Sequence, residues 1–233
     1  MFRPDIVPQV LPIPGGGLCL VFDDILLEPE RWRSRAAEFG AQFEPPQHNA
    51  YPGRELRLPD TVTAALLGTL SPWLQHHFGI VRIVDGYCRL SMVTLAPEQL
   101  TPAQSLCHRD RLHDPSGKLP LASVLYLFDD PPLGGTHFFR PILEKAPLMQ
   151  LLIDSNRMEA GAFFQHYRLS RGYMTESNAY FEKVLTVPAR YNRMIVYPGM
   201  NFHSGDIGRP DALTEDPLTG RLTFNGFFAG TMA

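Results

Sequence analysis

His108 and Asp110, separated by one residue, and the distant His203 are the side chains of this sequence best suited to hold a metal ion together. In a β-strand, residues two apart point to the same side, so His108 and Asp110 could reach one ion while Arg109 turns away. Two imidazoles and one carboxylate can occupy one face of an iron(II) ion and leave its opposite face open. The spacing therefore predicts an iron site to which a second strand brings His203.

A second group of side chains, near the end of the sequence, could bind a carboxylate. Arg221 and Thr223 begin the last apolar run, and strand alternation places both on one face. A guanidinium fork and a hydroxyl can together bind one carboxylate of a dicarboxylic acid. Because Arg221 also follows a turn at residues 216–220, a surface position is its alternative interpretation.

The residues between these two groups form short apolar runs that are separated by turns. Residues 122–128 (ASVLYLF) lead into a turn at 129–135 (DDPPLGG), which opens an aromatic run at 136–139 (THFF). Residues 193–197 (RMIVY) lead to His203, and the last run is 221–228 (RLTFNGFF). Short runs with turn signals between them are typical of a β-sandwich or jelly roll.

From residue 85 to 230, this succession resembles the iron(II)/2-oxoglutarate-dependent dioxygenases, in particular their prolyl-hydroxylase-like branch. The matching features are the His-x-Asp pair, a Tyr-Leu strand, a Gly-Gly turn before an aromatic strand, a distal histidine and an Arg-x-Thr strand. The resemblance implies a double-stranded β-helix core, of the jelly-roll or cupin-like type. It also implies iron(II) as the cofactor, with 2-oxoglutarate and molecular oxygen as co-substrates.

The resemblance assigns roles to individual residues as well. The metal ligands, and hence the catalytic centre, would be His108, Asp110 and His203. The contacts of the distal carboxylate of 2-oxoglutarate would be Arg221, Thr223 and Tyr126. For Tyr126, a buried position in the core is the alternative.

The identity of the anchoring arginine stays open at this point. In the family a basic residue usually follows the distal histidine more closely than Arg221, which here lies 18 positions after His203. Arg209 lies six positions after His203 and is the second candidate.

The sequence is therefore interpreted as an enzyme, an iron(II)- and 2-oxoglutarate-dependent dioxygenase. We expect it to oxidise, and most simply to hydroxylate, a C–H bond of an unidentified small molecule or of an amino-acid or peptide substrate. The alternative is a non-catalytic, cupin-like metal-binding protein that binds or senses a ligand. Release of succinate distinguishes the two. A metal-dependent hydrolase is less favoured, because a second carboxylate cluster and a dedicated general base are not obvious in the sequence.

Composition limits the domain organisation and the partners. The 233 residues are 44% hydrophobic, and no Gly/Ser linker or block of charge divides them, so we expect a single domain over 1–233. The net charge of −3 offers no electrostatic basis for binding nucleic acid or an anionic membrane. A small molecule or peptide is the expected partner, and the sequence leaves the oligomeric state open.

The cysteines and the amino terminus indicate a cytoplasmic protein. Cys19, Cys88 and Cys107 are few, odd in number and without paired spacing, which favours a reducing compartment. Strand alternation turns Cys107 away from the side that His108 faces, so thiolate ligation is disfavoured. The sequence has neither a signal-peptide pattern at its start nor an apolar run of membrane-spanning length.

Residues 1–84 are predicted to form strands and helices that pack on the core. Two strands are expected between residues 5 and 23, around a Pro-Gly-Gly-Gly turn, and a helix over 29–39. Asp60 is a plausible cap of a further helix, which Pro72 would interrupt or kink. Residues 81–95 read as a strand pair around Asp85-Gly86. The predicted fold class is thus mainly β with flanking helices (α+β).

Residues 142–190 break the pattern of short strands. The segment is too long for a plain loop, and its apolar spacing favours helices near 143–152 and 178–185. Its aromatic side chains could form a lid that keeps water from the iron site. A structural flap or a dimer contact is the alternative.

Overall fold

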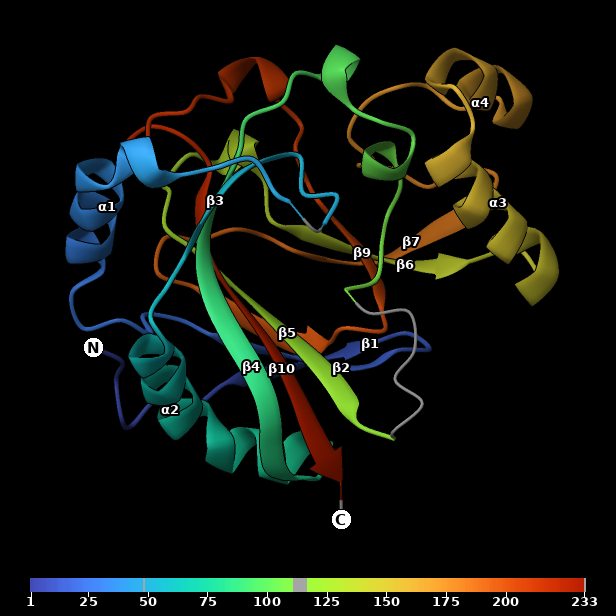
Figure 1. The fold of residues 1–233 in the computed structure, drawn as a ribbon. Coiled ribbons are helices and arrows are strands. Elements are labelled where there is room, and N and C mark those ends of the chain that lie inside the picture. Colours follow the sequence, from blue (N-terminus) through green and yellow to red (C-terminus); the bar gives the residue numbers. More distant parts are fainter. Residues whose placement is uncertain (48, 111–116, 233) are drawn as a thin grey trace.

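The described part of the chain folds into two antiparallel β-sheets, with helices α1 and α2 beside the larger sheet and α3 and α4 beside the smaller one (Figure 1). The computed structural model describes residues 1–47, 49–110 and 117–232. The α-helices are α1 (Pro29–Glu38), α2 (Asp60–Phe78), α3 (Lys145–Arg157) and α4 (Ala160–Tyr167). Short 3-10 helices cover Gly40–Gln42, Pro97–Gln99, Ala103–Ser105, Pro131–Leu133 and Pro210–Ala212.

The large sheet has the strand order β1-β2-β8-β5-β10-β4-β3, with every neighbouring pair antiparallel. Its strands are β1 (Gln9–Ile13), β2 (Gly17–Phe22), β3 (Gly53–Arg57), β4 (Ile80–Val93), β5 (Leu119–Tyr126), β8 (Met194–Pro198) and β10 (Leu222–Met232). β10 lies between β4 and β5 and pairs with both along its length. The amino-terminal segment thus supplies β1, β2 and β3 to the sheet itself.

The small sheet has the order β7-β6-β9, made of β6 (Thr136–Pro141), β7 (Phe181–Val187) and β9 (Phe202–Gly205). An isolated bridge between His108 and His203 adds His108 to the edge formed by β9. From β5 to β10 the chain crosses repeatedly between the sheets, with β5, β8 and β10 in the large one and β6, β7 and β9 in the small one, as in a jelly roll. The interior between the sheets receives side chains from both.

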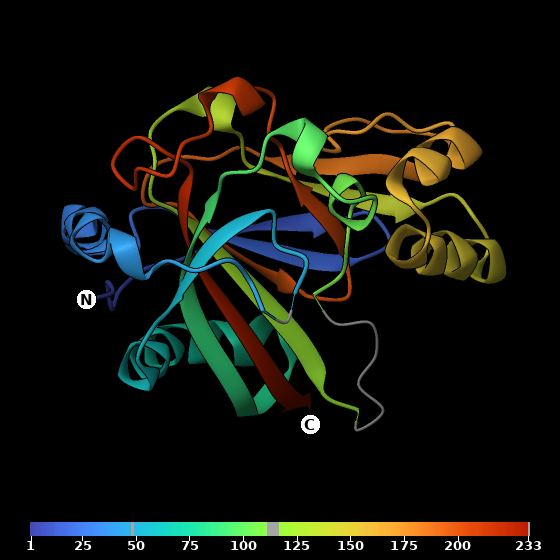
Figure 2. The same ribbon diagram turned by 45° about the horizontal axis from the view of Figure 1, so that its top comes forward.

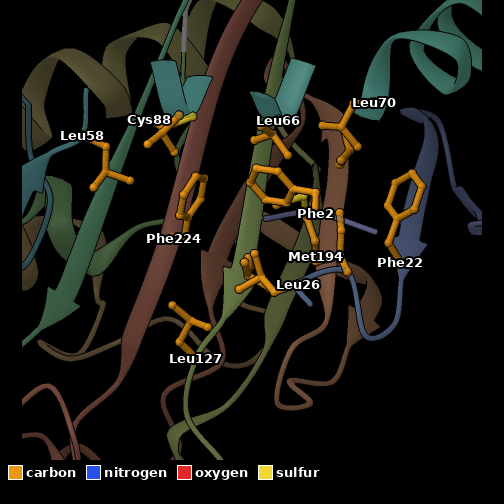
Figure 3. Packing of buried hydrophobic residues seen from close by; sticks show 14 of the residues in the cluster. Phe2, Phe22, Leu26, Leu58, Leu66, Leu70, Cys88, Leu127, Met194 and Phe224 are labelled. Carbon is orange, nitrogen blue, oxygen red and sulfur yellow. The ribbon is translucent and has the colours of Figure 1, made fainter. Parts of the chain in front are cut away.

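Period-two alternation along β10 divides its side chains between a core and the interior. Leu222, Phe224 and Phe228 join the hydrophobic cluster that also receives side chains of α1 and α2. Phe224 is labelled in this cluster in Figure 3. The ring of Phe224 meets Trp32 edge-on at 5.2 Å between centroids. The residues in between, beginning with Thr223, face the interior instead. This alternation fixes which polar groups can serve a site between the sheets.

The helices α3 and α4 pack on the outer side of the small sheet, on the opposite flank of the molecule from α2 (Figure 2). Their buried faces, including Leu151 and Phe163, meet Phe139 of β6 and Phe202 of β9 in a cluster that we call the outer cluster. Phe181 of β7 completes it. Most of the aromatic side chains of residues 142–190 therefore belong to this cluster or pack against it, although only Phe163 and Phe181 are fully buried.

Two local predictions from the sequence are wrong. Residues 178–185 do not form a helix, because β7 occupies this region and pairs with β6. Residues 81–95 do not form a strand pair: β4 continues through Asp85-Gly86, and a register shift opposite Ala229 and Gly230 takes up the irregularity. Of the two outcomes expected at Pro72, an interruption or a kink, the interruption does not occur, because α2 runs from Asp60 to Phe78 with Pro72 inside it.

Within the described ranges, the structure has no helix that is both long enough and apolar enough to cross a membrane.

Candidate metal centre and co-substrate pocket

The predicted metal ligands His108, Asp110 and His203 lie together, with one ligand atom from each within 4.8 Å of the others. Backbone hydrogen bonds of 2.9 Å run in both directions between His108 and His203 and set the two segments side by side. Asp110 follows, and its backbone N–H donates to the Gly199 carbonyl at 3.0 Å. His108 is a single bridge residue rather than part of a regular strand, so its partner on β9 holds it in place.

The side chains of this trio are oriented for a shared cation. Nδ1 of His203 is 3.0 Å from the Asn201 carbonyl, which leaves Nε2 toward Asp110, at 3.6 Å from Oδ2. Nε2 of His108 lies 3.9 Å from Oδ1 of Asp110. A backbone partner on the far ring nitrogen is how metal-ligating histidines are usually oriented. Oδ2 of Asp110 is buried and has no hydrogen-bond partner among the residues described. A divalent first-row ion fits this donor set and would satisfy that oxygen.

Electrostatics favour the protonation states that a metal ion needs. Burial lowers the pKa of His203 to about 4 and raises that of Asp110 to about 6. Desolvation, and after it the neighbouring His203, lower the pKa of His108 to about 4. The exposed fraction of the His108 side chain is 57%, because this side chain lines the cavity. At neutral pH both imidazoles are therefore free bases and the carboxyl group is mostly ionised. Each of the three can donate an electron pair without first losing a proton.

Arg221 is held rigidly at the start of β10. Only 5% of the residue is exposed. Its Nε donates to the Leu133 carbonyl at 2.8 Å, and its Nη2 donates to the carbonyls of Gly134 and Gly135 at 3.3 and 3.0 Å. The guanidinium group also lies 5.5 Å from the ring centre of Phe128. None of its described partners is a carboxylate, so its charge is not neutralised by a salt bridge.

The carbonyls that hold Arg221 belong to the Gly-Gly turn, and only glycine fits at position 134 of this turn. Its φ is +68°, and a Cβ atom there would lie 1.3 Å from the Asp206 carbonyl oxygen. Glycine accepts such a conformation without steric cost. The turn therefore brings three consecutive carbonyls around Arg221, which explains in physical terms why a Gly-Gly turn accompanies the arginine.

Thr223 and Tyr126 are directly opposite each other in the register of β10 and β5, but only Thr223 reaches the cavity wall. Tyr126 is fully buried, and its phenol is 2.8 Å from the hydroxyl of Thr136, which does line the cavity. Burial raises the pKa of Tyr126. Tyr126 therefore lies one layer behind the wall.

Sequence reasoning missed Tyr51, whose buried phenol lies in the cavity wall near Thr223. Burial raises its pKa, while the charges of Arg221 and Arg89 act in the opposite direction, which places the phenol close to both guanidinium groups. The stretch around it is irregular and rich in Pro and Gly, so neither strand nor helix periodicity pointed to it.

The competitor Arg209 lies elsewhere. Its side chain is 55% exposed and pairs with Asp211 at 3.2 Å, and it is not part of the cavity wall. Cys107 is buried in the outer cluster, on the far side of its segment from the cavity, and burial raises the pKa of its thiol. Neither residue is placed to take part in the site.

A cavity of about 660 Å³ joins the metal trio to Arg221 and Thr223. This volume is in the range of roughly 300–1,000 Å³ that is usual for sites that bind small molecules. From residues 142–190, Tyr173 and Met174 line it, and Tyr173 is fixed by a 2.6 Å hydrogen bond from its phenol to the Leu95 carbonyl. Side chains of α3 and α4 are not part of the wall. The contribution of the insertion to the cavity therefore comes from the segment after α4.

The comparisons with known proteins agree with this fold. The non-heme α-ketoglutarate-dependent carbocyclase SnoK from nogalamycin biosynthesis is similar, with a TM-score of 0.53 and 14% identity over 92% of this chain and 80% of that chain. HygX from Streptomyces hygroscopicus, with nickel and 2-oxoglutarate bound, has a TM-score of 0.50 and 13% identity over 93% of this chain and 83% of that chain.

A further structure with the same fold is the epimerase SnoN in complex with Fe³⁺, α-ketoglutarate and nogalamycin RO. Its TM-score is 0.52, with 13% identity over 94% of this chain and 82% of that chain. No curated protein sequence is significantly similar to this chain. A family of unknown function, DUF6445, matches residues 4–228. The expected jelly-roll fold of the iron- and 2-oxoglutarate-dependent oxygenases is thus confirmed, and the chain belongs to the family DUF6445.

Proposed function

We propose that this protein is an iron(II)- and 2-oxoglutarate-dependent oxygenase that hydroxylates a C–H bond of a small molecule or of an amino-acid or peptide substrate. One observation carries the proposal: a two-histidine, one-carboxylate trio shares one cavity with a buried arginine that has no carboxylate partner among the described residues. A site that only stored a metal ion would have no need of a buried cation facing the same space. A dicarboxylate that reached from the metal to Arg221 would use both.

His108, Asp110 and His203 would hold the iron, and when bound the iron supplies the activation of oxygen. Arg221 would bind the distal carboxylate of 2-oxoglutarate through its free edge, because its other donors are already fixed by the carbonyls of the Gly-Gly turn. Thr223 and Tyr51 would add hydroxyl groups to the same carboxylate.

The residues of the interior would also control water. Tyr197 is buried beside His203, with 4.9 Å between ring centres, and Phe138 supports both rings from β6. Such packing keeps the imidazole of His203 in one orientation and excludes solvent from that side of the site. Tyr173 and Met174 close another part of the wall. Oxidation would then be confined to a substrate that enters the remaining space.

The test has two steps, which separate binding from turnover. Calorimetry under anaerobic conditions should show that 2-oxoglutarate binds the iron-loaded protein with unit stoichiometry and binds the metal-free protein far more weakly. Admission of oxygen should then produce succinate. Binding without any succinate, also in the presence of candidate substrates, would support the non-catalytic, cupin-like alternative. A failure of 2-oxoglutarate to bind the metal-loaded protein would refute the proposal.

A further inference from the structure

The interior face of the large sheet carries a second polar region beyond Thr223. In the register of β10 and β4, Thr223 is opposite Ser91, Asn225 is opposite Arg89, and Phe227 is opposite Tyr87. Successive side chains on one face of a strand are roughly 7 Å apart. Arg89 and Asn225 therefore lie one step along the sheet from Thr223, in the same cavity wall.

Arg89 and Asn225 are both buried, and each has a hydrogen-bonding atom without a partner among the described residues. Arg89 is 7% exposed and Asn225 is 6% exposed. Nε of Arg89 and Oδ1 of Asn225 have no partner within the described part of the chain. The amide nitrogen of Asn225 is already used, donating to the Ser91 hydroxyl at 3.2 Å. One unsatisfied donor and one unsatisfied acceptor thus lie next to each other, on paired residues of neighbouring strands.

The guanidinium group of Arg89 is held in place for recognition. Glu55 of the neighbouring strand β3 forms a salt bridge with its Nη1. The central carbon (Cζ) of the group lies 4.9 Å from the ring centre of Phe227 and 5.2 Å from that of Tyr51. An arginine fixed on one edge by a carboxylate and on its faces by rings loses little freedom when its other edge binds a second carboxylate.

The balance of charges in the cavity also favours a substrate that carries a carboxylate. Among the described lining residues, three guanidinium groups, of Arg89, Arg109 and Arg221, accompany the carboxylate of Asp110, and Glu55 neutralises Arg89 from behind. A divalent metal ion and dianionic 2-oxoglutarate would cancel each other. One positive charge would then remain, which a single carboxylate on the primary substrate would balance.

Arg89 is better placed for this role than Arg109. The guanidinium group of Arg109 lies 4.1 Å from the ring centre of Phe202, which belongs to the outer cluster. Arg89 instead lies against Phe227 and Tyr51, which line the cavity. The net positive charge belongs to the cavity as a whole, and the ring contacts favour Arg89 over Arg109 as the group that meets a second carboxylate there.

We propose that Arg89 and Asn225 form the binding site for the primary substrate, which is a carboxylic acid with a hydrogen-bond donor next to its carboxyl group, such as a 2-amino or 2-hydroxy acid. The carboxylate binds the guanidinium edge of Arg89, and the donor binds Oδ1 of Asn225. This inference rests on the proposed function, because it takes Arg221 as the anchor of 2-oxoglutarate.

The test measures equilibrium binding without turnover. The protein is loaded with nickel(II) and saturating 2-oxoglutarate under anaerobic conditions, so that an added acid cannot occupy the metal. A panel of 2-amino and 2-hydroxy acids, with side chains from methyl to indole, is titrated by calorimetry. Each acid is paired with its primary carboxamide. We expect at least one acid to bind and its carboxamide to bind at least about tenfold more weakly, because a charged hydrogen bond is lost.

Variants assign that difference to the subsite. Arg89→Met should weaken binding of the acid at least about tenfold and leave binding of 2-oxoglutarate within about twofold of the wild type. Arg89→Lys, which keeps the pair with Glu55, should restore part of the affinity and shows that loss of binding is not loss of folding. The matched control is Arg57→Gln on β3, directly opposite Arg89 in register but outside the cavity wall, and it should change neither affinity.

Three results would overturn the inference while leaving the proposed function standing. The first is that 2-oxoglutarate binds but no acid of the panel does. The second is that carboxamides bind as well as acids. The third is that Arg89→Met weakens 2-oxoglutarate as much as the acid, which would assign Arg89 to the co-substrate. Failure of 2-oxoglutarate itself to bind the metal-loaded wild type would instead refute the proposed function.

Discussion

Replacing Arg221 by methionine gives the sharpest separation of the co-substrate site from the metal site. Methionine keeps most of the length and apolar bulk of the side chain but removes the charge and all the donors. The guanidinium group is buried and free of acidic partners within the described residues, so a carboxylate bound there would not compete with an existing salt bridge. We expect a large effect on 2-oxoglutarate and none on the metal ligands.

The magnitude follows from the contacts. A hydrogen bond to a charged group contributes about 1.5–3 kcal/mol, so losing the arginine–carboxylate interaction should raise the Kd of 2-oxoglutarate by roughly 10- to 100-fold or more. The substitution also removes the donors to the buried carbonyls of Leu133, Gly134 and Gly135. We therefore expect a separate loss of about 1–3 kcal/mol in the free energy of unfolding.

The assay measures both quantities on the same samples. Chemical denaturation gives the free energy of unfolding, and calorimetry with the folded, nickel-loaded protein gives the Kd of 2-oxoglutarate. Arg221→Lys should recover only part of the affinity, because one ammonium group cannot reproduce the fork. Arg209→Ala is the control, since its side chain is exposed and outside the cavity. Normal binding by Arg221→Met, together with loss of binding in Arg209→Ala, would refute the assignment of the anchor.

Three further outcomes follow from the same structure. Asp110→Asn should lower the affinity for iron(II) at least about tenfold, because a neutral amide replaces the anionic ligand. Competition with a chelator measures this affinity, and an unchanged value would exclude Asp110 as a ligand. Phe224→Ala should destabilise the fold by about 3–5 kcal/mol in denaturant, because a fully buried ring is removed from the core beneath α2; a loss below 1 kcal/mol would contradict that packing. The hydrogen bonds and charge of Arg193 hold the pKa of Asp23 below its usual value. The pair therefore stabilises the protein fully at a pH above the unfolded-state pKa of Asp. This contribution is lost as the pH falls through the lower, folded-state pKa. Since Asp23 is partly exposed, Asp23→Asn should cost at most about 1 kcal/mol at neutral pH and should reduce the acid sensitivity of unfolding; an unchanged pH profile would count against the pair.

The proximity of His108, Asp110 and His203 and the fold were predictable because their signals are local or repetitive. His108 and Asp110 are two residues apart, and the runs before His203 and after Arg221 have lengths and turns typical of strands. Alternation also predicted that Arg221 and Thr223 lie on one face, and both line the cavity. Spacing along the chain could not decide between Arg221 and Arg209, whose burial depends on how the Gly-Gly turn meets β10 in space.

The wrong predictions have a common physical origin in pairing between distant segments. In β7, Phe181, Val184 and Leu185 recur at helical spacing, but hydrogen bonds to β6 hold the segment extended. In β4, the Asp85-Gly86 dipeptide is a strong turn signal, yet β10 pairs across it and turns it into an irregularity of one long strand. Local preference is weak beside such pairing.

The polar residues missed by sequence reasoning show the same limit. Tyr51 lies in an irregular stretch, and Arg89 lies on a strand with no recognisable motif, so neither has a pattern in its own neighbourhood. Both become candidates only when the register of β3, β4 and β10 brings Glu55, Arg89 and Asn225 together in one cavity wall.

The central claim is that one cavity holds iron(II) at the trio and 2-oxoglutarate between the iron and Arg221. A crystal structure grown anaerobically with both is the most direct measurement. It should show Nε2 of His203, a nitrogen of His108 and a carboxylate oxygen of Asp110 at about 2.0–2.2 Å from one iron ion, with the distal carboxylate of 2-oxoglutarate hydrogen-bonded to Arg221. Iron bound elsewhere, or 2-oxoglutarate bound with its distal carboxylate away from Arg221, would contradict the account.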